Sequence, residues 1–295
     1  MSLDLWVDFF EDLQNVRGRS RNTVLAYRRD LELYEKFLET SKDIQEFYGF
    51  MEKQKLSSRS QARIISSLRT YFKYCDKRGT KVPDLKKVTP PQVKVGLPKV
   101  LTPDQFEKLF EAARVDNNFR TARNQVTLLL LFGVGCRVSE LIGLNVNDFN
   151  ETEGWVCLSG KGGKQRIVPL AEKLVKELKD YLRLVRPSLL SADTPVNSIL
   201  INDKTKRPSR VDIWRWLAAW SARAGFAKPI SPHKFRHGCA TALLDAGADL
   251  RSIQMLLGHS SIQSTQIYTS VTTKNLVEAV DTHHPFSQIK PKDHN

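Results

Sequence analysis

The sequence has few cysteines and no long hydrophobic run. Four cysteines, Cys75, Cys136, Cys157 and Cys239, are scattered over 295 residues without a C-x-x-C pair. This spacing argues against a disulfide framework and indicates reduced thiols in an intracellular protein. The most apolar stretch, residues 126–134, is too short to cross a bilayer, and acidic residues near the N-terminus argue against a signal peptide. We therefore expect a cytoplasmic chain without a membrane partner.

Acidic residues are the minority among the charged side chains. Lys and Arg total 46 against 32 Asp and Glu, which gives a formal net charge of +14 at pH 7. The excess is uneven, because residues 1–50 carry seven basic and ten acidic side chains whereas residues 51–100 carry thirteen and three. A positive excess of this size favours a polyanionic partner such as nucleic acid.

Two domains are expected at this length. Residues 1–80 have apolar positions at steps of three and four, first within 20–40 and again within 57–77, and the second stripe has arginines and lysines on its other faces. This periodicity predicts a small helical bundle. Basic side chains opposite an apolar stripe are typical of a solvated face, and the same arrangement suits helices that lie along DNA phosphates.

A linker is expected between the two domains. Residues 81–100 combine four prolines with several lysines and lack helical periodicity. Prolines favour extended conformations, which gives such a segment reach and some stiffness. The second domain is then expected over residues 101–295.

This second domain is predicted to be mainly helical with one β-hairpin. Thr102, Pro103 and Gln105 form a helix start signal. Residues 155–159 and 165–168 are expected to be strands around a glycine-rich tip, which lacks the spacing of a P-loop. Further helices are expected over 120–132, 172–185 and 209–224. In the last of these we expect three residues to face inward: Val211, Trp214 and Leu217.

Residues suited to phosphate chemistry gather between 231 and 268. His233 and Arg236 lie three apart near the start of a predicted helix. Asp249 is expected to cap the next helix, which closes at Gly258 directly before a histidine. Each of these side chains alone is more typical of ordinary packing than of catalysis. Together, imidazoles, a guanidinium and a phenol near helix ends suit a site that binds and attacks a phosphate.

These residues resemble the tyrosine recombinase (phage integrase) family, whose pattern is H-x-x-R, then L-G-H, then a tyrosine. The upstream members are also present, an arginine in GCRVSELIGL and a lysine in GKGGKQRIVPL. Six positions match the family in one order: Arg137, Lys161, His233, Arg236, His259 and Tyr268. The likeness covers nearly the whole chain and is closest to the bacterial Xer recombinases, slightly more to the D type than to the C type.

The resemblance implies a fold and a reaction. The expected architecture is an N-terminal helical core-binding domain (1–80) and a mainly α catalytic domain with a small β-sheet (101–295), which together form a clamp around DNA. The expected reaction is site-specific cutting and rejoining of DNA through a 3′-phosphotyrosyl intermediate, without metal or cofactor.

The resemblance also assigns the individual roles. Tyr268 would be the nucleophile, and Arg137 and Arg236 would bind the non-bridging oxygens of the phosphate. His259 would add a hydrogen bond there. Lys161 would protonate the leaving 5′-oxygen. The remaining group, His233, would orient or deprotonate the tyrosine. Glu140 is expected to hold the first arginine's region in shape, as the family's acidic residue does.

The family's partners are expected as well. They are a double-stranded DNA recombination site, a tetramer on two duplexes that includes a second Xer recombinase or four equal copies, and an activating FtsK-like septal DNA translocase. Together, these expected partners predict a nucleoid-associated protein that resolves chromosome dimers at cell division. Leu276, Val277 and Val280 are expected to form an apolar strip that docks on a neighbouring subunit.

Three other functions remain open from the sequence. The chain could be an integrase of a phage or mobile element, or a DNA-binding protein that does not cleave. His233 and His237 have the i, i+4 spacing of a helical metal pair, which would suit a metal-dependent hydrolase. No glutamate lies between these histidines and no acidic third ligand is near in the sequence, which argues against the metal site.

Overall fold

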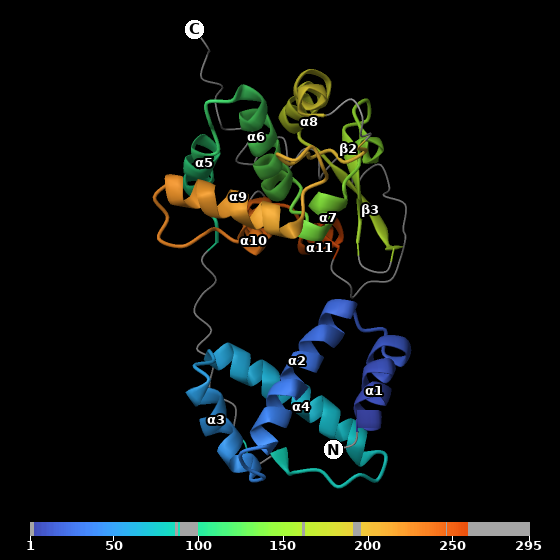
Figure 1. Ribbon diagram of the computed structural model, residues 1–295. Helices are drawn as coiled ribbons and strands as arrows, with labels where there is room; N and C mark the ends of the chain where they lie inside the picture. The colour runs from blue at the N-terminus through green and yellow to red at the C-terminus, as the bar shows by residue number, and fades with distance from the viewer. Residues whose placement is uncertain are drawn as a thin grey trace. The chain divides into compact units, whose positions relative to one another are not determined.

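The computed structural model describes residues 3–85, 88, 100–160, 163–190, 196–245 and 247–258. The chain divides into two compact units, an N-terminal unit, Met1–Pro98, and a C-terminal unit, Lys99–Asn295 (Figure 1). Some predicted features lie outside the described part of the chain. They are most of the linker, in residues 86–99 apart from residue 88, and everything predicted in residues 259–295, including the apolar strip at 276–280.

The N-terminal unit is helical, as its periodicity predicted. Its α-helices are α1 (Leu3–Glu11), α2 (Arg21–Leu38), α3 (Phe47–Lys53) and α4 (Ser58–Asp76). The two long helices begin where a serine side chain accepts a backbone N–H, Ser20 from Thr23 and Ser57 from Ser60. Their apolar faces meet in a core rich in rings, in which Phe9 packs edge-on against Tyr71.

The C-terminal unit contains seven α-helices among its described residues. They are α5 (Pro103–Ala112), α6 (Asn118–Gly133), α7 (Val138–Gly143), α8 (Glu172–Asp180), α9 (Arg210–Arg223), α10 (Pro232–Asp245) and α11 (Leu250–Leu257). Several start signals are confirmed. Thr102 and Gln105 form a reciprocal capping box at α5, and the Asp249 side chain accepts the Ser252 N–H at α11.

A small antiparallel sheet accompanies these helices. Its strands are β1 (Phe149–Asn150), β2 (Trp155–Ser159) and β3 (Gln165–Pro169), hydrogen-bonded in that order. In the register of the hairpin, Trp155 faces Pro169 and Cys157 faces Ile167. The predicted hairpin is therefore confirmed, and so is the expected class of a mainly α chain with a small sheet.

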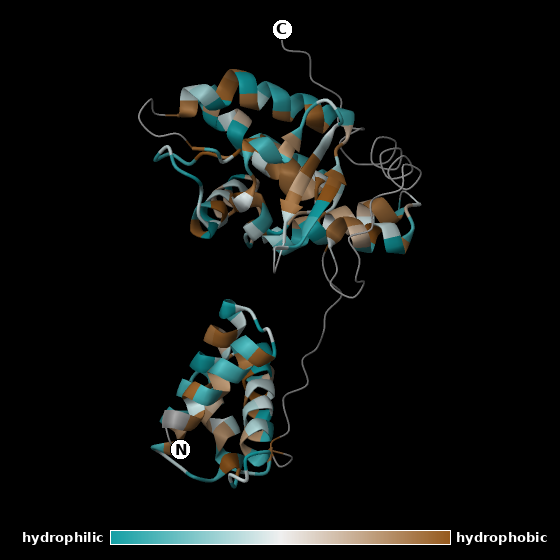
Figure 2. Cartoon of the chain, turned by 90° about the vertical axis from the view of Figure 1, so that its right-hand side faces the viewer, coloured by the Kyte–Doolittle hydropathy of each residue, from teal (hydrophilic) through white to brown (hydrophobic). Residues whose placement is uncertain are grey.

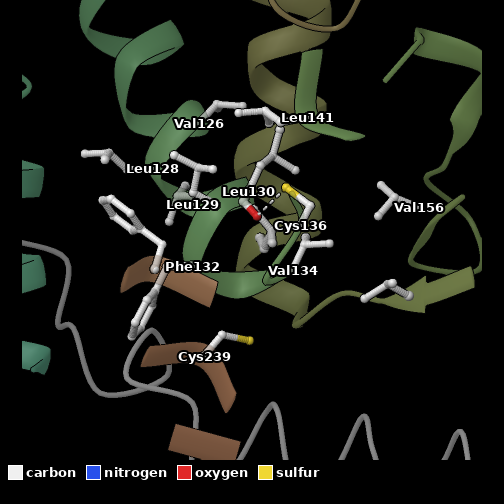
Figure 3. Packing of buried hydrophobic residues seen from close by; sticks show 14 of the residues in the cluster. Val126, Leu128, Leu129, Leu130, Phe132, Val134, Cys136, Leu141, Val156 and Cys239 are labelled. Carbon is white, nitrogen blue, oxygen red and sulfur yellow. Dashed lines mark hydrogen bonds between the residues drawn. The ribbon is translucent and has the colours of Figure 1, made fainter. Parts of the chain in front are cut away.

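The core of the C-terminal unit is built around α6. Most of its side chains from Val126 to Phe132 are buried, and they pack with residues of α10 such as Cys239 (Figure 3). Apolar and polar residues are interspersed along the helices of both units (Figure 2). Among the described residues, no helix has an apolar stretch long enough to span a bilayer.

One predicted helix face was wrong. The expected inward residues of α9 included Val211 and Trp214, but these side chains are 62% and 46% exposed. The buried stripe is instead formed by Ile213, Leu217 and Trp220. Steps of four and three keep these residues on one side of a helix. Trp214 is thereby left free to line the cleft described next.

Candidate active site

Three of the predicted site residues surround one cleft in the C-terminal unit. The cleft has a volume of about 230 Å³. Its lining residues come from the start of α7, the start of α9 and the first turns of α10: Cys136, Arg137, Val138, Ser139, Arg210, Trp214, Pro232, His233 and Arg236. The other predicted members, Lys161, His259 and Tyr268, lie outside the described residues.

A tight turn between α6 and α7 delivers Arg137 to this cleft. Gly135 has a φ of +61°, and a Cβ there would lie 2.6 Å from Leu257 Cδ2 and 3.0 Å from Cys239 Sγ. Only glycine fits both this backbone conformation and this close approach. The next residue, Cys136, is buried and its thiol donates to the Leu130 carbonyl at 3.4 Å (Figure 3). The turn is thus anchored in the core immediately before Arg137.

The Arg137 guanidinium is held on one side and exposed on another. Its backbone N–H donates to Glu140 Oε2 at 2.7 Å, and its Nη1 donates to Glu140 Oε1 at 2.8 Å. Its Nη2 donates to the carbonyl of Gly258 at 3.0 Å. The Arg137 side chain remains 42% exposed. A half-exposed guanidinium with a fixed orientation is suited to bind an incoming phosphate.

Arg236 approaches the same cleft from α10. Its Nη1 donates to the Gly135 carbonyl at 2.8 Å, and its Nη2 donates to the carbonyl of Leu257. Burial, and then the positive charges of Arg137 and Arg166, lower the pKa of Arg236 to about 10. The group remains protonated at neutral pH. An anion in the cleft would relieve the repulsion between these guanidiniums, so their arrangement favours anion binding.

Two further cleft residues come from α9 and were not among the predicted site residues. Arg210 and Trp214 lie at the start of this helix and line the cleft with His233, which is exposed in the first turn of α10. The helix dipole of α10 places its positive end here. Among the described residues that line the cleft there are three arginines, a histidine and no carboxylate. The signal in the sequence that could have indicated α9 is a basic residue followed one helical turn later by an aromatic one, Arg210 and Trp214.

Glu140 is the negative centre behind the cleft. Its side chain is 1% exposed. Burial by itself would raise its pKa, but hydrogen bonds from Arg166 and from the Arg137 backbone outweigh this and lower the pKa to about 2. Glu140 is therefore a carboxylate at neutral pH that orients its neighbours. The expectation that it holds the region of Arg137 in shape agrees with these contacts.

The cysteines near the cleft are buried thiols. Burial raises the pKa of Cys136 and of Cys239 to about 12. Thiols with such pKa values are weak nucleophiles at neutral pH. Within the described parts of the chain, no group of three or more His, Cys, Asp or Glu residues is arranged to hold a metal ion.

Two family models match this chain. The model described as "Phage integrase family" matches residues 99–275, and the model described as "Phage integrase, N-terminal SAM-like domain" matches residues 7–79. The chain is also 37% identical over 295 residues to tyrosine recombinase XerD of Listeria monocytogenes serotype 4b (strain F2365). That alignment covers 96% of this chain and 99% of the relative.

Solved structures share the fold. The crystal structure of XerA recombinase is 29% identical, with a TM-score of 0.50, over 99% of this chain and 100% of that one. The crystal structure of a lambda integrase tetramer bound to a Holliday junction has a TM-score of 0.65 at 18% identity, over 90% of this chain and 80% of that one. At this lower identity the similarity is one of fold.

Proposed function

Since the chain belongs to the phage integrase family, as a site-specific tyrosine recombinase of the Xer type, we propose that Arg137, Lys161, His233, Arg236, His259 and Tyr268 are its catalytic residues. The observation that carries this proposal is the cationic cleft between α7, α9 and α10. It brings Arg137 together with His233 and Arg236, which lie about 100 residues later in the sequence.

The proposed chemistry is a transesterification at phosphorus. The Tyr268 hydroxyl attacks the scissile phosphate, a phosphorus–oxygen bond to the tyrosine forms, and the bond to the 5′-oxygen breaks. Lys161 gives a proton to the leaving 5′-oxygen, and the tyrosine's proton passes to His233. The energy of the broken bond is kept in the phosphotyrosine, so the reverse reaction rejoins DNA without ATP.

The two arginines would supply fixed positive charge where negative charge develops on the phosphate oxygens. Arg137 and Arg236 would donate to the non-bridging oxygens, and His259 would add a third donor. Donors that are already oriented stabilise the pentavalent transition state without reorganisation at the moment of reaction. The hydrogen bonds that hold Arg137 and Arg236 support this role.

The domain roles are part of the same proposal. The helical domain over 1–80, with exposed basic residues along α4, would bind one face of the DNA. A linker over 81–100 would join it to the catalytic domain over 101–295, and the two would close around the duplex as a clamp. The similar lambda integrase assembles as a tetramer on a Holliday junction, and we propose a tetramer on two duplexes here.

A suicide substrate tests the catalytic proposal. A DNA site with a nick near the scissile phosphate loses a short fragment after cleavage, so the covalent protein–DNA complex accumulates and migrates separately in a denaturing gel. We expect the wild-type chain to form this complex in excess EDTA and Tyr268→Phe to form none. Undiminished trapping by Tyr268→Phe would exclude this nucleophile, and complete loss with EDTA would favour metal-dependent hydrolysis.

The cellular role is proposed from the XerD relatives. Chromosome dimer resolution in the cytoplasm, on nucleoid DNA, requires one recombination site near the replication terminus and an activator at the septum, such as an FtsK-like translocase. Genome-wide binding of the chain in its host tests this. One strong site near the terminus supports the role, and a site at the end of a mobile element would favour an integrase.

A further inference from the structure

The last turn of α11 is held by three different arginines. The carbonyls of Leu256, Leu257 and Gly258 follow one another along the chain at the C-terminal end of α11, and an α-helix supplies no intrahelical donors to the carbonyls of its last turn. Three arginine side chains donate to these carbonyls, one each, in the order Arg166, Arg236, Arg137. The last two belong to the proposed catalytic set, whereas the first has no assigned role.

Arg166 connects this helix end to the Glu140 carboxylate. Its Nε donates to the Leu256 carbonyl at 2.7 Å. Its Nη1 and Nη2 donate to the two oxygens of Glu140, at 2.8 and 2.9 Å. The side chain is 11% exposed and comes from β3, the strand that follows the hairpin tip. One guanidinium thus joins three elements that are far apart in the sequence: β3, α7 and α11.

Each oxygen of Glu140 accepts two hydrogen bonds, one from each arginine. Oε1 receives Nη1 of Arg137 and Nη1 of Arg166, and Oε2 receives the backbone N–H of Arg137 and Nη2 of Arg166. Removal of Arg166 would leave a buried carboxylate with half of its donors, free to rotate with Arg137 attached to it. The orientation of Arg137 therefore depends on a residue that does not line the cleft.

The backbone at Gly258 leaves the space that Arg166 occupies. Gly258 has a φ of +66°, and a Cβ there would lie 3.1 Å from Arg166 Nη1 and 3.3 Å from its Cζ. Any side chain at this position would push on the guanidinium. The glycine is needed both for the left-handed end of α11 and for the close approach of Arg166.

We propose that Arg166 is a positioning residue of the recombinase reaction, which sets the orientation of Arg137 through Glu140 and fixes the end of α11 through the Leu256 carbonyl. This inference rests on the proposed function, because it is through Arg137 and the segment after α11 that Arg166 would affect cleavage. The planar guanidinium of Arg166 is required. A lysine ammonium is a single point of charge and cannot bond both carboxylate oxygens and the carbonyl in the same geometry.

Single-turnover cleavage of the suicide DNA, with affinity measured separately, tests the proposal. We expect Arg166→Ala to lower the cleavage rate at saturating DNA by about 100-fold, the usual effect of a small misplacement of catalytic groups. Its DNA affinity should stay within about threefold of wild type. Arg166→Lys keeps the positive charge and is less prone to misfold than Arg166→Ala. Its cleavage rate should fall by about the same factor. Guanidinium ion at millimolar concentration should restore part of the rate of Arg166→Ala.

The matched control is Arg183→Ala, which removes an exposed arginine paired with Glu151 in the same unit. It should cleave at the wild-type rate and show no guanidinium effect. A wild-type rate in Arg166→Ala or Arg166→Lys would overturn the proposal. A parallel loss of affinity and rate in both variants would also overturn it, since that is the result of a purely structural role.

Hydrogen–deuterium exchange separates this inference from the proposed function. In the full-length chain without DNA, Arg166→Ala should speed amide exchange at least tenfold in α7 and α11, and Arg183→Ala should not. This readout does not depend on catalysis. Absence of cleavage by the wild-type chain would contradict the proposed function alone, whereas unchanged exchange in Arg166→Ala would contradict the positioning role alone.

Discussion

The two units use their arginines in different ways. In the N-terminal unit, Arg63 bonds the buried carboxylate of Asp30, and Arg28 lies over the ring of Phe10. In the C-terminal unit, arginine side chains donate to backbone carbonyls: Arg123, Arg137, Arg166, Arg186, Arg207, Arg223 and Arg236. Many of these carbonyls belong to elements far away in the sequence, so the guanidiniums act as crosslinks between elements.

The difference follows from how each unit is stabilised. The N-terminal core is made largely of packed rings, and its exposed arginines on α4 lie on the solvent side of that core. In the C-terminal unit, arginines donate to carbonyls in turns and at helix C-terminal ends, such as those of Gly135 and Leu257, where a helix supplies no backbone donor. We therefore expect arginine substitutions in the N-terminal unit to change DNA affinity, and those around the cleft to change the geometry of catalysis.

The largest expected effect is at Arg236. Arg236→Ala removes a proposed donor to the phosphate and two hydrogen bonds that join α10 to Gly135 and to the end of α11. We expect the single-turnover cleavage rate to fall about 1,000-fold at saturating DNA. The control is Arg223→Ala, which also loses a carbonyl contact, to Arg114, but does not line the cleft. An equal loss of rate in both variants would contradict the special role of the cleft.

The second effect is on stability, at Glu140. Its pKa is lowered from 4.5 to about 2 in the folded chain, so its stabilisation is fully present above pH 4.5 and is lost as the pH falls towards 2. This shift corresponds to about 3 kcal/mol. We expect Glu140→Gln to lower the free energy of unfolding by about that amount at pH 7, and by about half as much or less near pH 3.

Urea denaturation of the full chain at the two pH values measures this change. The control is Glu151→Gln, because Glu151 forms an exposed ion pair with Arg183 and such pairs contribute little. A loss of stability in Glu140→Gln that is the same at pH 3 and pH 7 would show that the ionised carboxylate is not the source.

A smaller effect is expected on the exposed face of α4. Arg59 and Arg69 are exposed on this helix. Replacing both with alanine should weaken DNA binding. It should also reduce the slope of log Kd against log salt by about two, because binding then makes two fewer phosphate contacts and releases fewer counterions. The cleavage rate at saturating DNA should stay within about threefold. A changed rate with an unchanged salt slope would mean that the N-terminal arginines act on geometry after all.

The smallest effect is expected at Arg28. Its guanidinium lies 5.1 Å from the centre of the Phe10 ring on an exposed surface. Arg28→Ala should lower the free energy of unfolding by less than about 1 kcal/mol, the usual size of such a contact. Thermal unfolding measures it, with the exposed neighbour Arg29→Ala as control. A loss of several kcal/mol would show that Arg28 stabilises the N-terminal unit far more than a surface contact does.

Local signals predicted much of the fold. The capping box at Thr102, the cap at Asp249 and the left-handed end at Gly258 are confirmed, because each depends only on residues next to it in the chain. The β2–β3 hairpin is confirmed for the same reason. The inward face of α9 was wrong, because Val211 and Ile213 are equally apolar and only the partner helices decide which one is buried.

The composition and motifs of this chain were enough to identify its family, its helical character and the residues that we propose to be catalytic. Those conclusions depend on spacing along the chain, which tertiary packing does not alter. Only the tertiary structure revealed that Arg137 and Arg236 share a cleft with Trp214, and that Arg166 and Glu140 hold one of them in place. Hydrogen bonds between residues as far apart as Arg166 and Leu256 exist only after the elements have packed, so no local pattern in the sequence contains them.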